Sequence, residues 1–242
     1  MEGKLKDRIA VITGAGKGIG RATALLFVKE GAVVFAVART KSDIESLAHA
    51  TRGFAGKIIP SAGDVTDRDF VEKLFAGTEK EFGRLDILVN SAGFVAGGSI
   101  FNMDPDKFLE CLKVNIWSTF LCTQQAARIM KKNNCGKIIN LGSVRSHWTE
   151  SGSAGAYNAS KYGVKGFTES VARELHGSGL NISVGMVCPG VTDTPMTNPG
   201  GDPVPKYMKA EVVAKAILFA AANPENVNAY DITLFSTDQK PW

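Results

Sequence analysis

The chain has 242 residues, 44% of them hydrophobic and 21% charged, which is the composition of a globular protein long enough to bury a large core. Its net charge of +4 is scattered along the sequence, so nothing in it favours a nucleic-acid partner. No apolar run reaches the ~20 residues of a membrane span, and the first residues lack the apolar core of a signal peptide, so we expect a cytoplasmic protein without a membrane partner.

Short apolar runs rich in β-branched residues alternate with longer amphipathic stretches. The runs predict seven strands, at 8–13, 32–38, 57–63, 85–90, 136–143, 181–189 and 229–235. The amphipathic stretches predict helices, among them 18–30, 67–82, 104–132, 155–176 and 208–222. This alternation predicts an α/β fold in which a doubly wound parallel sheet of about seven strands is flanked by helices on both faces. No long polar linker interrupts residues 1–242, so we expect a single domain.

A cluster of glycines follows the first predicted strand. Gly14, Gly18 and Gly20 lie between that strand and the helix expected at 18–30, in the spacing Gly-x-x-x-Gly-x-Gly. A tight turn at this place lets a diphosphate approach the helix N-terminus, whose unpaired N–H groups and dipole favour anions. The cluster therefore indicates a nucleotide site, with a simple packing turn as the alternative.

The second predicted strand indicates which nucleotide is bound. A site for NAD usually has an acidic residue at the end of this strand, where it holds the ribose 2′-hydroxyl. Here Ala38 and Arg39 occupy that place, and Lys17 lies in the glycine turn. Two cations without an acid favour the 2′-phosphate of NADP, unless both cations are merely solvated.

The stretch SAGAYNASKYG, at 153–163, opens the helix expected at 155–176. Tyr157 and Lys161 are four residues apart and therefore share one face of that helix. Taken alone, such a pair also fits a surface helix whose lysine is solvated. Its meaning depends on the rest of the chain.

Two other features carry expectations of their own. The segment 192–207 contains four prolines and two glycines, which predicts a mobile substrate flap or, as the alternative, a plain surface loop. The cysteines show neither Cys-x-x-Cys spacing nor neighbouring histidines, so we expect buried thiols in a reducing compartment and no metal site. They are Cys111, Cys122, Cys135 and Cys188.

Several short motifs now stand in order along the chain. After the glycine turn come NSAG at 90–93, Asn115 within KVNIWS, Ser143 at the end of NLGS, the Tyr157–Lys161 pair, and CPGVTDT at 188–194. Together, over residues 5–235, they resemble the short-chain dehydrogenase/reductase family. The resemblance implies a single Rossmann-type domain, carbonyl or alcohol chemistry with NAD(P), and a homodimer or homotetramer.

The resemblance also assigns roles to individual residues. It implies a catalytic group of Asn115, Ser143, Tyr157 and Lys161. Beside Tyr157 and Lys161, the cofactor-binding residues that the motifs imply are Gly14, Lys17, Gly18, Ile19, Gly20, Arg39, Asp64, Val65, Asn90, Ala92, Gly93, Pro189, Gly190, Thr192 and Thr194. His147 and Trp148 fall on the loop that would wall the substrate site together with Ser143 and Tyr157, or else they only pack that loop.

The chemistry explains why a tyrosine and a lysine would share a helix face. Hydride transfer to a ketone places negative charge on its oxygen, which then needs a proton donor. We expect Lys161 to lower the pKa of Tyr157 and Ser143 to hydrogen-bond the substrate oxygen. Asn115 would break the helix locally and hold a water that supplies protons to Lys161.

The leading hypothesis is thus an NADPH-dependent oxidoreductase that interconverts a ketone and a secondary alcohol on a small carbonyl or hydroxy-acid-like substrate. One alternative is a 3-oxoacyl-(acyl carrier protein) reductase, for which Arg128, Lys131, Lys132 and Arg173 would offer a docking surface. Another is a non-catalytic NADP-sensing regulator, although a sensor has no need of a proton donor. Apolar residues in excess on the helices expected at 104–132 and 155–176 predict that a homo-oligomer forms there.

Overall fold

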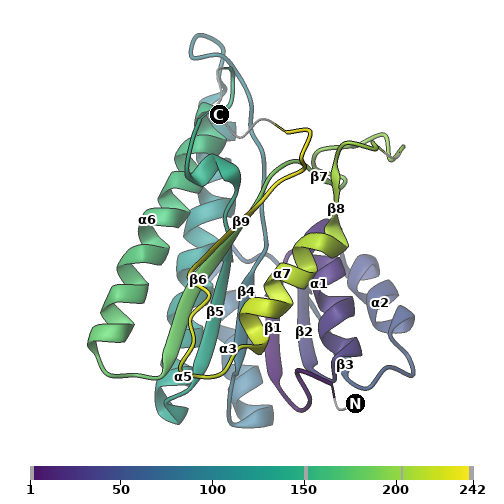
Figure 1. The fold of residues 1–242 in the computed structure, drawn as a ribbon, viewed down its shortest axis with the longest axis vertical. Helices are drawn as coiled ribbons and strands as arrows, with labels where there is room; N and C mark the ends of the chain where they lie inside the picture. Colours follow the sequence, from purple (N-terminus) through teal and green to yellow (C-terminus); the bar gives the residue numbers. More distant parts are fainter. Residues whose placement is uncertain (1–2, 150–151, 203, 240–242) are drawn as a thin grey trace.

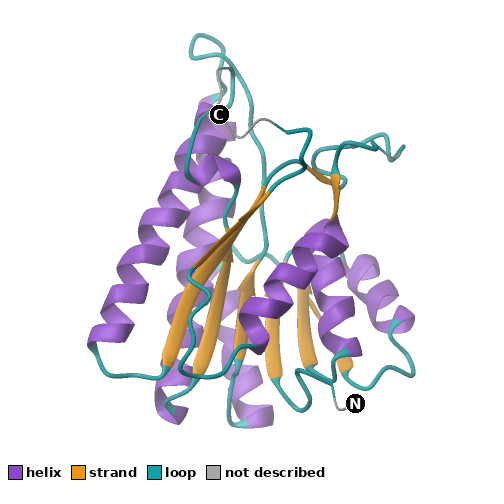
Figure 2. Cartoon of the chain, viewed as in Figure 1, coloured by secondary structure: helices purple, strands orange, loops and turns teal. Residues whose placement is uncertain are grey.

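The computed structural model describes residues 3–149, 152–202 and 204–239. Seven parallel strands form one twisted sheet between two layers of helices (Figures 1 and 2). In sheet order they are β3 (Lys57–Ala62), β2 (Val33–Ala38), β1 (Ile9–Thr13), β4 (Ile87–Asn90), β5 (Gly136–Leu141), β6 (Ile182–Pro189) and β9 (Asp231–Leu234). All seven predicted strands form, and the doubly wound α/β fold is confirmed.

The helices divide between the two faces of the sheet. One layer holds α1 (Gly18–Lys29), α2 (Lys41–Ala50) and α7 (Ala210–Ala222). The other holds α3 (Arg68–Phe82), α5 (Ser118–Asn133) and α6 (Gly155–Gly177), with α4 (Pro105–Leu112) packed beside α6. None of the described helices combines the length and the apolar character that a bilayer-spanning segment requires.

The core lies on both faces of the sheet because the strand residues alternate between them. In β1, Ala10 and Ile12 pack in the layer of α1 and α7, whereas Ile9 and Val11 pack in the layer of α3 and α5. All five β1 residues are buried. This two-sided burial explains why the strands appear in the sequence as nearly continuous apolar runs.

The helix expected at 104–132 is interrupted in the structure. After α4, residues Lys113–Trp117 form a π-helical turn (η1), and only then does α5 begin. Such wide turns leave backbone groups partly unpaired and concentrate at functional sites. The interruption agrees with the expectation that Asn115 breaks the helix locally.

Two smaller features differ from the sequence prediction. The helix α2, which buries only Ile44 and Leu47, was not among the predicted helices. The last predicted helix begins at Ala210 rather than at residue 208, because β8 (Met208–Lys209) pairs in parallel with β7 (Thr192–Asp193). This short ladder closes the base of the segment expected to form a flap.

Candidate active site

A cleft of about 590 Å³ opens at the carboxyl ends of the strands, where the strand order reverses between β1 and β4. Ligands of open α/β sheets bind at such a switch point. Every strand from β1 to β6 sends its following loop to the cleft, and α6 contributes two side chains. The lining residues are 14, 16–20, 38–40, 43, 63–65, 91–95, 114, 141–143, 189–190, 192 and 194–197, with Tyr157 and Lys161 from α6.

The glycine turn forms the floor of the cleft. Gly14 has φ +66°, and a Cβ there would lie 2.7 Å from the Ser91 carbonyl oxygen. Gly18 has φ +54°, and its missing side chain leaves space beside Thr194. The first turn of α1 contains no acidic side chain that would compete for its N–H groups. The turn therefore fits a diphosphate at the N-terminus of α1.

Two cations lie at one end of this floor. Lys17 and Arg39 both line the cleft, and their side chains reach it from the glycine turn and from the end of β2. Asp43, in the first turn of α2, lies beside them, with its Oδ2 3.5 Å from Lys17 Nζ. Arg21 donates a 3.0 Å hydrogen bond to the Asp43 carbonyl and fixes this part of the backbone. The sequence prediction did not include Asp43 among the site residues.

Ser143, Tyr157 and Lys161 face the opposite end of the cleft. Ser143 caps a short 3₁₀ turn (η2, Val144–Ser146), and its side chain shares a hydrogen bond with the Tyr157 hydroxyl. The buried Lys161 ammonium donates a 2.7 Å hydrogen bond to the Leu141 carbonyl and lies 5.6 Å from the centre of the Tyr157 ring. A proton donor, a hydroxyl and a buried amine thus meet on one wall.

The pKa values of this group differ from the expectation for Tyr157. Burial raises the pKa of Tyr157, and the hydrogen bond from Ser143 and the charge of Arg145 oppose that rise only in part. Burial also lowers the pKa of Lys161 to about 8. Desolvation of the buried Tyr157 hydroxyl thus outweighs the attraction to Lys161 that was expected to lower the tyrosine pKa.

Asn115 stands behind the cleft wall rather than on it. From the π-helical turn its Oδ1 accepts a 2.8 Å hydrogen bond from the Phe94 N–H, and its Nδ2 donates to the Phe94 carbonyl at 2.9 Å. The same Nδ2 donates to Ser160 Oγ at 2.8 Å. Asn115 therefore fastens the loop after β4 to the helix that carries Tyr157 and Lys161.

A sequence profile of the short chain dehydrogenases matches residues 8–203. This chain belongs to the short-chain dehydrogenase/reductase family. The 3-oxoacyl-[acyl-carrier-protein] reductase FabG of Thermotoga maritima is 36% identical over 230 residues, which cover 91% of this chain and 92% of that protein.

Solved structures of the family share the fold. A short-chain type dehydrogenase/reductase of Mycobacterium marinum superposes with a TM-score of 0.88 at 30% identity, covering 96% of this chain and 95% of that one. A metagenomic short-chain oxidoreductase in complex with NADP superposes with a TM-score of 0.84 at 26% identity, covering 98% and 100%. The resemblance seen in the sequence is confirmed at the level of the family.

Besides Asn115, three expected site residues of this short-chain dehydrogenase/reductase do not line the cleft. Asn90 is buried in the sheet, where it donates to Asn140 Oδ1 at 2.8 Å and to Thr123 Oγ1 at 3.1 Å, and so joins β4 to β5 and α5. His147 and Trp148 turn towards β9, where Trp148 packs edge-on against Phe235. Their position in sequence is that of a substrate wall, but the η2 turn directs their side chains to the sheet edge. All the other implied cofactor residues line the cleft.

Contacts from the end of the chain were not foreseen. The Gly190 N–H donates to the Leu234 carbonyl at 2.7 Å, and the Val191 N–H donates to Gln239 Oε1 at 2.9 Å. A Cβ at Gly190 would lie within 2.7 Å of Phe235 Cβ. The segment after β6 is thus held by residues 234–239. Nothing in the local sequence signals these contacts, because they join positions more than 40 residues apart.

Proposed function

We propose that this oxidoreductase transfers a hydride between NADP(H) and a small ketone or secondary alcohol. One observation carries the proposal: the glycine turn, the two cations and the Ser143–Tyr157–Lys161 group line a single cleft. A binding module or an NADP-sensing regulator would need the first two features only. A buried amine beside a tyrosine and a serine in the same cleft is what proton transfer to a substrate oxygen requires.

The residues present fit NADP. The Gly14–Gly20 turn would receive the diphosphate, and Lys17 and Arg39 would bind the 2′-phosphate, Arg39 as a planar fork and Lys17 as a point charge. The solved metagenomic relative is itself a complex with NADP. When bound, the cofactor supplies or accepts the hydride, and the protein supplies the placement and the proton.

The protein's own groups then carry the proton step. The Ser143 hydroxyl and the Tyr157 hydroxyl would both hydrogen-bond the substrate oxygen and stabilise the charge that develops on it. Tyr157 donates its proton to that oxygen as the alcohol forms. Lys161, with a pKa lowered to about 8, exchanges protons near neutral pH and favours the phenolate left behind. In the oxidative direction the same steps run in reverse.

The test compares Tyr157→Phe and Ser143→Ala with the unmodified protein, using NADPH and a panel of ketones, diketones, β-keto esters and acyl-carrier thioesters. Tyr157→Phe should reduce turnover by about 10²–10⁴-fold, because the proton donor is lost, while NADPH binding followed by fluorescence stays within about threefold. If Tyr157→Phe kept more than about 1% of the wild-type activity, Tyr157 would not be the proton donor. If the unmodified protein reduced none of these carbonyl compounds, the result would favour the alternative of a non-catalytic NADP-sensing regulator.

A second candidate substrate is a 3-oxoacyl group on acyl carrier protein, the substrate named for the Thermotoga maritima relative. On α5, Arg128 and Lys131 have no ion-pair partner among the described residues, so they are available to an acidic carrier, whereas Lys132 and Arg173 pair with Glu79 and Glu169. If this candidate is right, Arg128→Ala with Lys131→Ala should lower kcat/KM for the carrier thioester and spare a small β-keto ester.

We further propose that segment 192–207 acts as a substrate flap and that the protein is a cytoplasmic homo-oligomer. Met196 and Thr197 of that segment line the cleft. Phe108, Leu109 and Trp117 are exposed along α4 and the π-helical turn, an apolar strip of the kind that second subunits cover. The four cysteines are free thiols, which suits a reducing compartment.

A further inference from the structure

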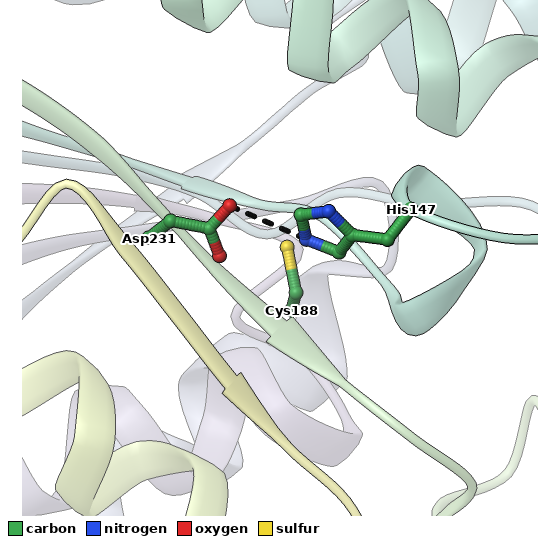
Figure 3. Close-up of side chains that lie close together, drawn as sticks. All are labelled: His147, Cys188 and Asp231. Atoms are coloured by element: carbon green, nitrogen blue, oxygen red, sulfur yellow. Dashed lines mark ion pairs between the residues drawn. The ribbon is translucent and has the colours of Figure 1, made fainter. Parts of the chain in front are cut away.

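Three metal-ligating side chains meet at the sheet edge formed by β6 and β9. His147 comes from the turn after η2, Cys188 from β6 and Asp231 from the start of β9 (Figure 3). One ligand atom of each lies within 4.8 Å of the other two, and His147 Nε2 is 3.3 Å from Asp231 Oδ2. None of the three lines the catalytic cleft.

The arrangement does not suit a cysteine nucleophile. In a nucleophilic triad the acid and the thiol occupy opposite nitrogens of the imidazole, so that one nitrogen takes the thiol proton while the acid orients the ring through the other. In Figure 3 the sulfur and the carboxylate both approach the same nitrogen of His147, Nε2. The other nitrogen, Nδ1, lies 3.1 Å from Lys165 Nζ. Three donors that converge on one point are arranged as the ligands of an ion.

The spacing can be compared with that of a zinc site. Bonds of about 2.0–2.3 Å in a tetrahedron separate the ligand atoms by about 3.3–3.6 Å. The His147–Asp231 separation already has this value, and the other two separations, each within 4.8 Å, need to shrink by about 1.3 Å at most. We propose that His147, Cys188 and Asp231 bind one divalent transition-metal ion, with Zn²⁺ as the best match to a thiolate, an imidazole and a carboxylate.

The surroundings support such a site. The Cys188 side chain is fully buried, and burial raises the pKa of its thiol to about 12, so the site would form a thiolate only when a bound ion displaces the proton. The side chains of His147 and Asp231 are 17% and 24% exposed, which leaves an entry path and room for a water as fourth ligand. The sequence could not indicate this site, because its ligands are 41 and 43 residues apart.

Metal binding rearranges the protons of the cluster. The thiol of Cys188 releases its proton to solvent, and the imidazole stays neutral by carrying its single proton on Nδ1 while Nε2 binds the ion. The Lys165 ammonium can then no longer donate to Nδ1 and must turn to solvent. The Lys165 ammonium therefore weakens metal binding, and replacing Lys165 by methionine should strengthen the binding of the metal ion.

The experiment is a Co²⁺ titration of the full-length protein freed of metal with a chelator, followed by competition with Zn²⁺. One equivalent of Co²⁺ should give the near-ultraviolet thiolate charge-transfer band and the visible bands of tetrahedral cobalt, which Zn²⁺ removes. Cys188→Ser should abolish the charge-transfer band. His147→Gln and Asp231→Asn should each weaken binding at least tenfold, and Lys165→Met should tighten it several-fold.

The matched control is Cys135→Ser. Cys135 also lies beside a carboxylate, with its sulfur 3.3 Å from Glu225 Oε1, but the chelating cluster does not include it. This variant should bind Co²⁺ like the wild type. The proposal is overturned if the wild type gives no charge-transfer band at millimolar Co²⁺, if the band persists in Cys188→Ser, or if only Cys135→Ser loses it. The readout is independent of turnover, so an inactive enzyme would not affect it.

Discussion

Replacing Asp43 by asparagine should strengthen NADPH binding without changing NADH binding. The carboxylate of Asp43 lines the cleft and stands 3.5 Å from the Lys17 ammonium, the cation assigned to the 2′-phosphate. A bound phosphate must therefore share Lys17 with a negative charge of the protein. Asparagine has the same shape and no charge, and the hydrogen bond from Arg21 to the Asp43 carbonyl keeps the backbone in place.

The size of the effect follows from the exposure of the pair. The Lys17 side chain is 65% exposed, so its pairing with Asp43 contributes only about 0.2–1 kcal/mol. Two unit charges at ion-pair distance in water interact by about 1 kcal/mol, which salt reduces further. In Asp43→Asn the carboxylate no longer competes for Lys17 and no longer repels the phosphate. The Kd for NADPH should therefore fall by about three- to tenfold, since 1.4 kcal/mol corresponds to a factor of ten.

The assay is a fluorescence titration of NADPH and NADH against the wild type, Asp43→Asn and Glu45→Gln. Glu45 lies on the same helix and pairs with Lys41, so its variant carries the same change of net charge away from the cleft. Added salt should shrink the difference between Asp43→Asn and the wild type. If the Kd values for NADPH and NADH fell equally, or if both variants lowered the Kd for NADPH equally, a local effect on the phosphate would be refuted. An unchanged Kd for NADPH in Asp43→Asn would show that Lys17 does not bind the phosphate.

Three other predictions follow from the site and the surface. Ala38→Asp with Arg39→Leu should shift kcat/KM towards NADH by at least about a hundredfold, because an acid replaces the fork that binds the phosphate; equal use of both cofactors by the wild type would contradict this. Burial lowers the pKa of Lys161 to about 8, and the unfolded lysine keeps its proton to about 10.5. The Tm of the wild type, measured without cofactor, should therefore rise relative to that of Lys161→Met between pH 7 and pH 10, and a flat difference would exclude the lowered pKa. Leu109→Glu should shift an oligomer towards monomer in sedimentation velocity, and a wild type that is monomeric at micromolar concentration would remove the interface.

The sheet could be predicted because its strands are buried on both faces. Such burial leaves continuous apolar runs in the sequence, as in β1, and the chain places a glycine turn directly after one of them. The loops that follow parallel strands meet at one sheet edge whatever their side chains are. The turn at Gly14 and the cations Lys17 and Arg39 could therefore be placed at the cleft from their positions, whereas the pair Tyr157 and Lys161 on α6 was placed there by the family resemblance.

Side-chain direction could not be predicted in the same way. Asn90 ends a strand, but its amide turns away from the cleft to reach Asn140 on the neighbouring strand β5 and Thr123 on α5. His147 follows Ser143 by only four residues, and the intervening 3₁₀ turn rotates it to the far side. The raised pKa of Tyr157 likewise depends on how deeply the group is buried, which no spacing reports.

Because Leu234 and Gln239 anchor Gly190 and Val191, the catalytic cleft cannot be completed during synthesis until residue 239 has left the ribosome. A nascent chain that has released β6 already contains the glycine turn and the tyrosine–lysine pair, yet the loop after β6 still lacks both of its acceptors. Until residue 239 has emerged, a nucleotide can contact only part of its binding site. Loss of residues 235–239 would remove the Gln239 acceptor while the Leu234 carbonyl and all seven strands of the sheet remain.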